Sequence, residues 1–278
     1  TVHISPPSIR CHHCGHASKI PQNCPSCGVS QFETLGVGTQ QLEAILRDRF
    51  KLTPVYRIDR DTTRNKNQFE EIIDKITPGE SCLMIGTQMI AKGLDFPDVT
   101  LVGVINADTS LGLPDFRSAE RTFQLLTQVS GRAGRSEKSG EVIVQSFNPE
   151  HYAIQHAKEH DYDTFYKKEM HLRHISDYSP YYYLVRLSVS HEQEMTAAKK
   201  IGEFIDFIRP ALSEKAIVLV PTPKSIARTH NRYHFQAIIK YKKEAALSEG
   251  LHELLMTTQK DQAKGLFISI DAQPVNFI

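Results

Sequence analysis

The sequence predicts an α/β protein with a parallel sheet and helices on both faces, preceded by a short metal-binding module and followed by an α+β domain. Three observations predict this. Two cysteine pairs precede residue 34, apolar strand patterns and helical patterns alternate over 35–178, and the pattern changes after residue 178. The 278 residues exceed one typical domain, and 40% hydrophobic residues suffice to build the cores. We therefore expect modules at 1–34, 35–178 and 179–278.

The middle module alternates two kinds of pattern. Helical periodicity covers 40–50, 68–76, 116–129 and 151–175, and short apolar runs typical of buried parallel strands cover 55–58, 82–85, 101–105 and 141–145. Repeated strand and helix elements imply a parallel sheet covered on both faces. This is the organisation of a RecA-like lobe.

The last module begins after Tyr178-Ser179-Pro180. Alternating or apolar strand patterns cover 182–189, 216–220 (running on toward Arg228), 233–241 and 265–270, and helical patterns cover 192–208 and 244–255. The order βαββαβ predicts a ferredoxin-like, split βαβ domain.

Four of the five cysteines form two CxxC pairs, Cys11 with Cys14 and Cys24 with Cys27, each followed by glycine. Paired CxxC units at short spacing indicate zinc, since four thiolates fill a tetrahedral shell. The alternative is a disulfide staple, which a reducing compartment disfavours. Cys82 lies in an apolar strand pattern and is expected to be an inert core thiol.

Composition limits the classes of partner. A net charge of +1 argues against nucleic-acid binding through bulk charge, so any DNA contact must come from local patches. No apolar run reaches membrane-spanning length, and the first residues lack a signal pattern. We therefore expect a cytoplasmic protein without a membrane partner.

The segment Gln128-Val129-Ser130-Gly131-Arg132-Ala133-Gly134-Arg135 places two arginines three positions apart on a Gly-broken turn behind a helical run. A guanidinium fork can hold a γ-phosphate oxygen and stabilise the charge that develops during phosphoryl transfer. The alternative is a helix C-terminus with basic residues and a glycine stop.

Upstream, Gly86-Thr87-Gln88-Met89-Ile90-Ala91-Lys92-Gly93-Leu94-Asp95-Phe96 separates two apolar strand patterns. Ligands of α/β sheets bind at the carboxyl ends of strands, where this segment would lie. The two motifs, in this order, resemble motifs V and VI of superfamily 2 helicases. Essentially the whole chain resembles the PriA family, primosomal protein N-prime. The resemblance includes the segment between the two motifs, Leu113-Pro114-Asp115-Phe116-Arg117-Ser118-Ala119-Glu120-Arg121-Thr122-Phe123.

The resemblance implies roles for single residues. Arg132 and Arg135 would contact the γ-phosphate of ATP, with Arg135 as the finger and Gln128 in support, while Gly93 and Asp95 would lie near the ribose. Thr39, Thr87 and Gln88 look like neutral donors to DNA phosphates. Structural alternatives stay open: Thr39 as a helix cap, Asp95 as a turn cap, and Lys92 as a solvent-facing side chain.

The sequence contains no G-x-x-x-x-G-K-[ST] loop and no D-E-x-H box, which a superfamily 2 motor needs to hold ATP and Mg²⁺. We therefore expect a fragment that does not hydrolyse ATP alone. PriA proteins carry four CxxC pairs that interleave around two zinc ions. By that resemblance, Cys11 and Cys14 belong to one site, and Cys24 and Cys27 to the other, so each is half complete. The fragment is expected either to assemble one improvised site or to remain metal-free.

A basic run in the last module is the best nucleic-acid candidate outside the motor. Cations and rings interleave without an acidic residue, and the candidates are Lys224, Arg228, Arg232 and Tyr233. Cations follow phosphates while rings stack on bases. The alternatives are a partner's acidic tail as the ligand, or a solvated hairpin. The acidic-tail pocket of the family is not carried over, because Glu244 stands where positive charge is expected.

The resemblance implies an ATP-dependent 3'-to-5' DNA helicase that acts in replication restart and primosome assembly. Its partners would be branched and single-stranded DNA, single-stranded DNA-binding protein and other primosome proteins, at replication forks of a bacterial nucleoid. The main alternative is a non-catalytic zinc and DNA-binding module, whose Gly-Arg turns are only structural. An RNA helicase is disfavoured by the CxxC pairs and the last module.

Overall fold

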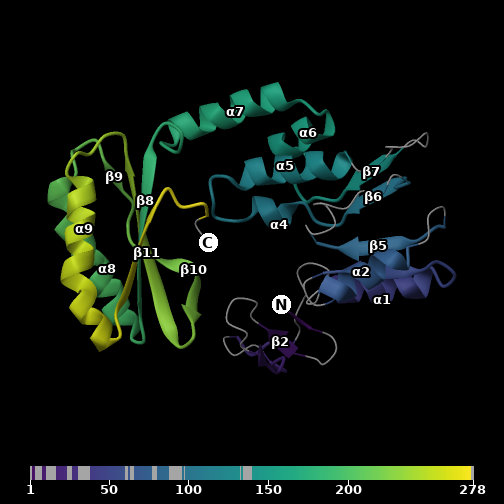
Figure 1. Cartoon of the computed structure of the whole chain (residues 1–278), viewed down its shortest axis with the longest axis horizontal. Helices are drawn as coiled ribbons and strands as arrows, with labels where there is room; N and C mark the ends of the chain where they lie inside the picture. The colour runs from purple at the N-terminus through teal and green to yellow at the C-terminus, as the bar shows by residue number, and fades with distance from the viewer. Residues whose placement is uncertain are drawn as a thin grey trace. The chain divides into compact units, whose positions relative to one another are not determined.

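The computed structural model describes residues 2–3, 8–10, 17–23, 27–30, 38–59, 62, 66–76, 80–87, 96, 98–131, 133 and 140–276. They form a mixed α/β protein, shown in Figure 1. The chain divides into two compact units, one of residues 1–111 and 121–161 and the other of residues 112–120 and 162–278. Among the described helices, none is both long and apolar enough to cross a membrane.

The first unit begins with a small antiparallel sheet of β1 (Val2–His3), β2 (Ser8–Arg10) and β3 (Ala17–Ser18). Residues 11–16 and 24–26, with three of the four paired cysteines, lie outside the described residues. The predicted zinc module therefore stays a prediction. Cys27, the fourth, is exposed.

Two parallel strand pairs follow in the same unit. Strand β4 (Val55–Ile58) pairs with β5 (Leu83–Gly86), and β6 (Leu101–Val104) pairs with β7 (Glu141–Val144), both in parallel register. The helices are α1 (Thr39–Arg49), α2 (Lys66–Asp74), α4 (Asp108–Leu111), α5 (Ser118–Ser130) and α6 (Tyr152–Lys158). The parallel pairing is confirmed; a single sheet with helices on both faces stays a prediction.

The second unit holds an antiparallel sheet in the order β10–β11–β8–β12, with β9 also pairing with β11. Its elements are α7 (Tyr162–Ile175), β8 (Tyr183–His191), α8 (Glu194–Ile208), β9 (Ile217–Val218), β10 (Thr222–Thr229), β11 (Arg232–Tyr241), α9 (Leu247–Thr258) and β12 (Phe267–Ala272). The order is βαβββαβ, which differs from the predicted βαββαβ by one additional short strand, β9.

Helices α8 and α9 cover one face of this sheet (Figure 1). The core between them includes Val185, Leu187 and Val189 of β8, with Ile201 and Ile208 of α8. Because side chains alternate along a strand, the residues between these on β8 face the other side of the sheet. That second face displays polar and basic groups.

Several predicted boundaries were wrong for local reasons. The helix predicted at 151–175 is two helices, because His160 adopts a φ of 55° that ends the first. The strand predicted at 216–220 and beyond is divided into β9 and β10 by a break that contains Pro221, which lacks the N–H that a ladder needs.

The helix predicted from residue 244 begins at Leu247. Here the Glu244 carboxylate accepts hydrogen bonds from the Ser213 N–H at 2.9 Å and its hydroxyl at 2.6 Å. Glu244 therefore ties the end of β11 to the turn after α8, and the helix starts beyond it.

Candidate functional site: a helicase lobe and a basic sheet face

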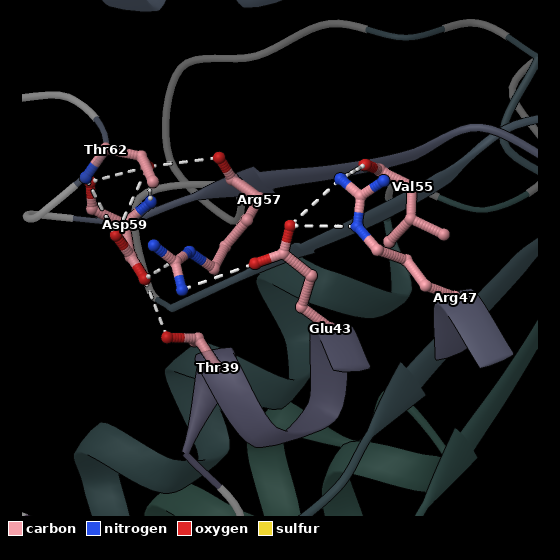
Figure 2. A network of polar contacts seen from close by, with 7 residues as sticks. All are labelled: Thr39, Glu43, Arg47, Val55, Arg57, Asp59 and Thr62. Carbon is pink, nitrogen blue, oxygen red and sulfur yellow. Dashed lines mark hydrogen bonds and ion pairs between the residues drawn. The ribbon is translucent and has the colours of Figure 1, made fainter. Parts of the chain in front are cut away.

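The beginning of α1 is tied to the carboxyl end of β4 by the polar network in Figure 2. Thr39, the first residue of α1, donates its hydroxyl proton to Asp59 Oδ2 at 2.6 Å. The N-cap residue is Gly38, so the alternative of Thr39 as a side-chain cap is wrong. The Thr62 N–H donates to Asp59 Oδ1 at 3.0 Å.

Asp59 is buried but stays charged. Burial alone would raise its pKa, but the hydrogen bonds from Thr39 and Thr62 and the charge of Arg57 lower that pKa below its ordinary value. A hydroxyl has one proton to donate. The Thr39 hydroxyl can therefore donate to a DNA phosphate only by releasing Asp59.

Two arginines extend this network along α1 and β4 (Figure 2). Arg57 lies 3.3 Å from Asp59 Oδ2 and 3.3 Å from Glu43 Oε2. Arg47 donates to Glu43 at 2.9 Å and to the Val55 carbonyl at 2.8 Å. These residues border a cleft of about 380 Å³ that Tyr56, Ile72 and Lys75 also line. Sequence reasoning missed Asp59, although a carboxylate at a strand's carboxyl end was the available signal.

The predicted nucleotide residues are only partly within the described chain. Gln128 is half-buried on the last turns of α5, and Thr87 is exposed directly after β5. Arg132, Arg135, Gly93, Asp95 and Gln88 lie outside the described residues. Their predicted roles stay predictions.

The structure splits the four predicted DNA residues of the last unit between the two faces of the sheet. Arg228 pairs with Tyr233 across β10 and β11, and its guanidinium lies 4.8 Å from the ring centroid. Tyr233 shares its face with Phe235, which packs against the core. Arg232 and Lys224 instead belong to the opposite, polar face.

Arg232 crosses that polar face. Its guanidinium donates to the Ser190 carbonyl at 2.8 Å and to the Gly265 carbonyl, and it lies 4.4 Å from the centroid of Phe267. Phe267 is 51% exposed, and the sequence prediction did not include it. Its partner across the ladder is Ser190, which in turn pairs with His234.

Two basic groups lie near one another on this face. Burial and the charge of Lys224 lower the pKa of His234, although a hydrogen bond from its ring to the Thr229 backbone opposes this. Burial and the charge of Arg186 lower the pKa of Lys224. On the described strands of this face, Asp271 is the only carboxylate, and it pairs with Arg186 at 2.8 Å. The face therefore favours an anionic ligand.

Comparison with known proteins assigns both units. The family model "Helicase conserved C-terminal domain" matches residues 31–137, and "Primosomal protein N C-terminal domain" matches residues 174–275. Replication restart protein PriA of Bacillus subtilis is 46% identical over 275 residues, covering 99% of this chain and 34% of that protein. The chain belongs to the PriA family.

Other PriA proteins agree. Those of Synechocystis and Haemophilus influenzae are 41% and 34% identical, covering 84% and 99% of this chain but 28% and 38% of their own lengths. The chain thus spans about a third of the relatives it matches. Thr39, Thr87 and Gln128 fall within the helicase model, and the polar sheet face falls within the PriA-specific one.

The predicted metal ligands of this PriA-family chain are only partly described. Among the described residues, His156, Glu159 and Asp161 have ligand atoms within 4.8 Å of one another, at the end of α6. Exposed acidic groups often cluster in this way without a metal, so we assign no site there. The paired cysteines were the predicted ligands, and of these only Cys27 is described.

Proposed function

We propose that this chain is the second motor lobe and C-terminal domain of an ATP-dependent 3'-to-5' DNA helicase that acts in replication restart and primosome assembly. The observation that carries the proposal is the helicase match over residues 31–137, which includes the Gln128–Arg135 motif. The PriA relatives support the replication role.

In this proposal Arg132 and Arg135 reach ATP and Mg²⁺ held by another lobe, with Gln128 supporting them and Gly93 and Asp95 near the ribose. The described α5 supports it, since a rigid helix leads directly into the arginine segment. Thr39, Thr87 and Gln88 would contact DNA phosphates. With no P-loop pattern in its sequence, the chain alone should not hydrolyse ATP.

The experiment supplies a P-loop lobe in trans and measures ATP hydrolysis. We expect hydrolysis only when both parts are present, and a loss of about a thousandfold or more with Arg135→Ala, in the range of an arginine finger. ATP binding should persist in that variant, since the P-loop lobe supplies most contacts. Hydrolysis unaffected by Arg135→Ala would remove this residue from the motor and favour the non-catalytic zinc and DNA-binding module.

We further propose that DNA, branched or single-stranded, contacts the polar face of the β10–β11–β8–β12 sheet. Arg232 and Lys224 offer positive charge on this face, and Arg232 lies beside Phe267, whose ring can stack on a base. We also propose a ferredoxin-like topology for this domain, which the order of β8, α8, β10, β11, α9 and β12 supports, with β9 as an additional short strand. Single-stranded DNA-binding protein and other primosome proteins remain proposed partners from the family.

A further inference from the structure

The polar face of the β10–β11–β8–β12 sheet contains a lysine without a counter-charge. Lys224 of β10 is half-buried, and its ammonium forms no hydrogen bond or ion pair with any residue that the structure describes. Asp271, the only carboxylate on the described strands of this face, pairs instead with Arg186 at 2.8 Å. Burial and the charge of Arg186 lower the pKa of Lys224, and the charge of Asp271 only partly opposes this. An anionic ligand would therefore stabilise Lys224 in its charged form.

His234 lies beside Lys224 on the neighbouring strand. Pro223 pairs with Phe235 across β10 and β11, and Lys224 follows the first of these residues while His234 precedes the second. The imidazole Nε2 of His234 is 2.7 Å from the Thr229 hydroxyl. Burial and the charge of Lys224 lower the pKa of His234, so the ring is neutral at neutral pH. An anion beside both groups would reverse this effect, because negative charge favours the imidazolium.

The row of residues that contains His234 leads across the sheet to an exposed ring. His234 pairs with Ser190 of β8, and Ser190 pairs with Phe267 of β12. Two strand spacings, or about 10 Å, separate His234 from Phe267. The Phe267 side chain is 51% exposed. A nucleic-acid strand that crosses the sheet along this row brings a phosphate to one end of the row and a base to the other.

We propose that Lys224 and His234 form a phosphate site for single-stranded DNA that crosses the sheet toward Phe267, and that His234 takes up one proton when the site fills. The proton comes from solvent, and no covalent step is involved. This site rests on the proposed contact of DNA with the polar face, to which it adds a direction, phosphate ligands and a dependence on pH.

The dependence on pH has a defined sign. The charges of Arg232 and His230, like that of Lys224, lower the pKa of His234 in the free protein. A bound phosphate raises that pKa. Affinity should therefore rise as the pH falls through the pKa of the complex, and should level off below the lower pKa of the free protein. Uptake of one proton limits the change to about tenfold per pH unit.

The experiment measures binding of a fluorescent oligothymidylate to this chain by anisotropy, between about pH 5.5 and about pH 8. His234→Gln keeps a hydrogen-bonding side chain that does not titrate, so it should bind like the wild type at high pH and lose the rise at low pH. Lys224→Gln should weaken binding at every pH and raise the pKa of His234 in the free protein, as read from imidazole NMR shifts. The controls are His252→Gln and Lys199→Gln, which change exposed side chains of α9 and α8 and should behave like the wild type.

Sulfate is the second probe, since it carries charge like that of phosphate but no base. We expect sulfate to raise the pKa of His234 relative to chloride at equal ionic strength, in the wild type but not in Lys224→Gln.

An affinity for oligothymidylate that is independent of pH would overturn the phosphate site and leave the proposed DNA contact standing. The same rise at low pH in His234→Gln as in the wild type would do so too. If oligothymidylate does not bind while sulfate still raises the pKa of His234, the proposed DNA contact fails and the anion site is retained. Failure of both probes would remove both.

Discussion

Arg232 lies on the face that we propose for DNA, but its donors are already used within the protein. Its donors are directed at the Ser190 and Gly265 carbonyls, so they hold its guanidinium beside the Phe267 ring. A guanidinium committed in this way has fewer donors left for phosphate. The ring, half-exposed, is the group that a base can reach. On this face we therefore expect Phe267 and Lys224 to make the contacts with a nucleic-acid ligand.

We expect Phe267→Ala to weaken binding of a fluorescent oligothymidylate to this chain by about 1–3 kcal/mol, the value of one stacked base. Lys224→Ala should reduce the slope of log affinity against log salt by about one phosphate contact. Fluorescence anisotropy over a salt series measures both. Phe207→Ala, which removes a 42% exposed ring from α8, is the matched control and should bind normally. Equal affinity in Phe267→Ala and wild type would move the DNA site elsewhere.

At the scale of elements, two glycines in neighbouring helices should respond differently to alanine. A Cβ on Gly202 of α8 meets nothing within 4 Å, whereas one on Gly250 of α9 lies 3.2 Å from the Ala211 Cβ and 3.7 Å from Ile208 Cδ1. Alanine favours a helix by about 1 kcal/mol over glycine. Gly202→Ala should therefore stabilise by about that amount, while crowding in Gly250→Ala should cancel the gain.

Urea unfolding of the two variants and the wild type measures this difference. Equal stabilisation by both alanines would show that α9 shifts away from Ala211 at no cost. The comparison isolates the packing of α8 on α9, since helix propensity enters both variants alike.

Elements were predictable from the sequence where local pattern decided them. Strands 55–58 and 101–105 match β4 and β6 within one residue because short runs rich in β-branched and aliphatic residues favour extended backbone. Local pattern failed where a distant partner decided the outcome. Glu244 leaves the helix because of Ser213, 31 positions away, and the four predicted DNA residues separate because the ladder register sends Tyr233 and Arg232 to opposite faces.

The same limit applies to the candidate site of the whole molecule. The sequence motifs were enough to predict Gln128 and Thr39 as site residues. They did not predict Asp59, which accepts a hydrogen bond from Thr39, or Arg173, which pairs with Glu120 of α5. Glu120 and Arg173 are 53 positions apart, so no sequence spacing links them. The pair is a tertiary contact within the second unit, and only the fold brings its two members together.

The metal content of the whole chain follows from its cysteine count. Two tetrahedral tetrathiolate sites would need eight thiolates, and the chain has five cysteines, of which four are paired as CxxC. Cys82 is half-buried, and burial raises the pKa of its thiol, which disfavours the thiolate that a metal needs. We therefore expect no more than about one zinc ion per chain by metal analysis of the purified protein.

Replacing Cys27 should abolish or weaken that zinc binding, whereas Cys82→Ser should retain it and serves as the control. Cobalt substitution should give the spectrum of one tetrahedral thiolate site if all four paired cysteines bind the same ion. Close to two zinc ions per chain would contradict the argument, since incomplete thiolate sets would then be completed by other groups. The described histidines and carboxylates would be the first to examine, because nitrogen and oxygen ligands complete zinc shells when thiolates are too few.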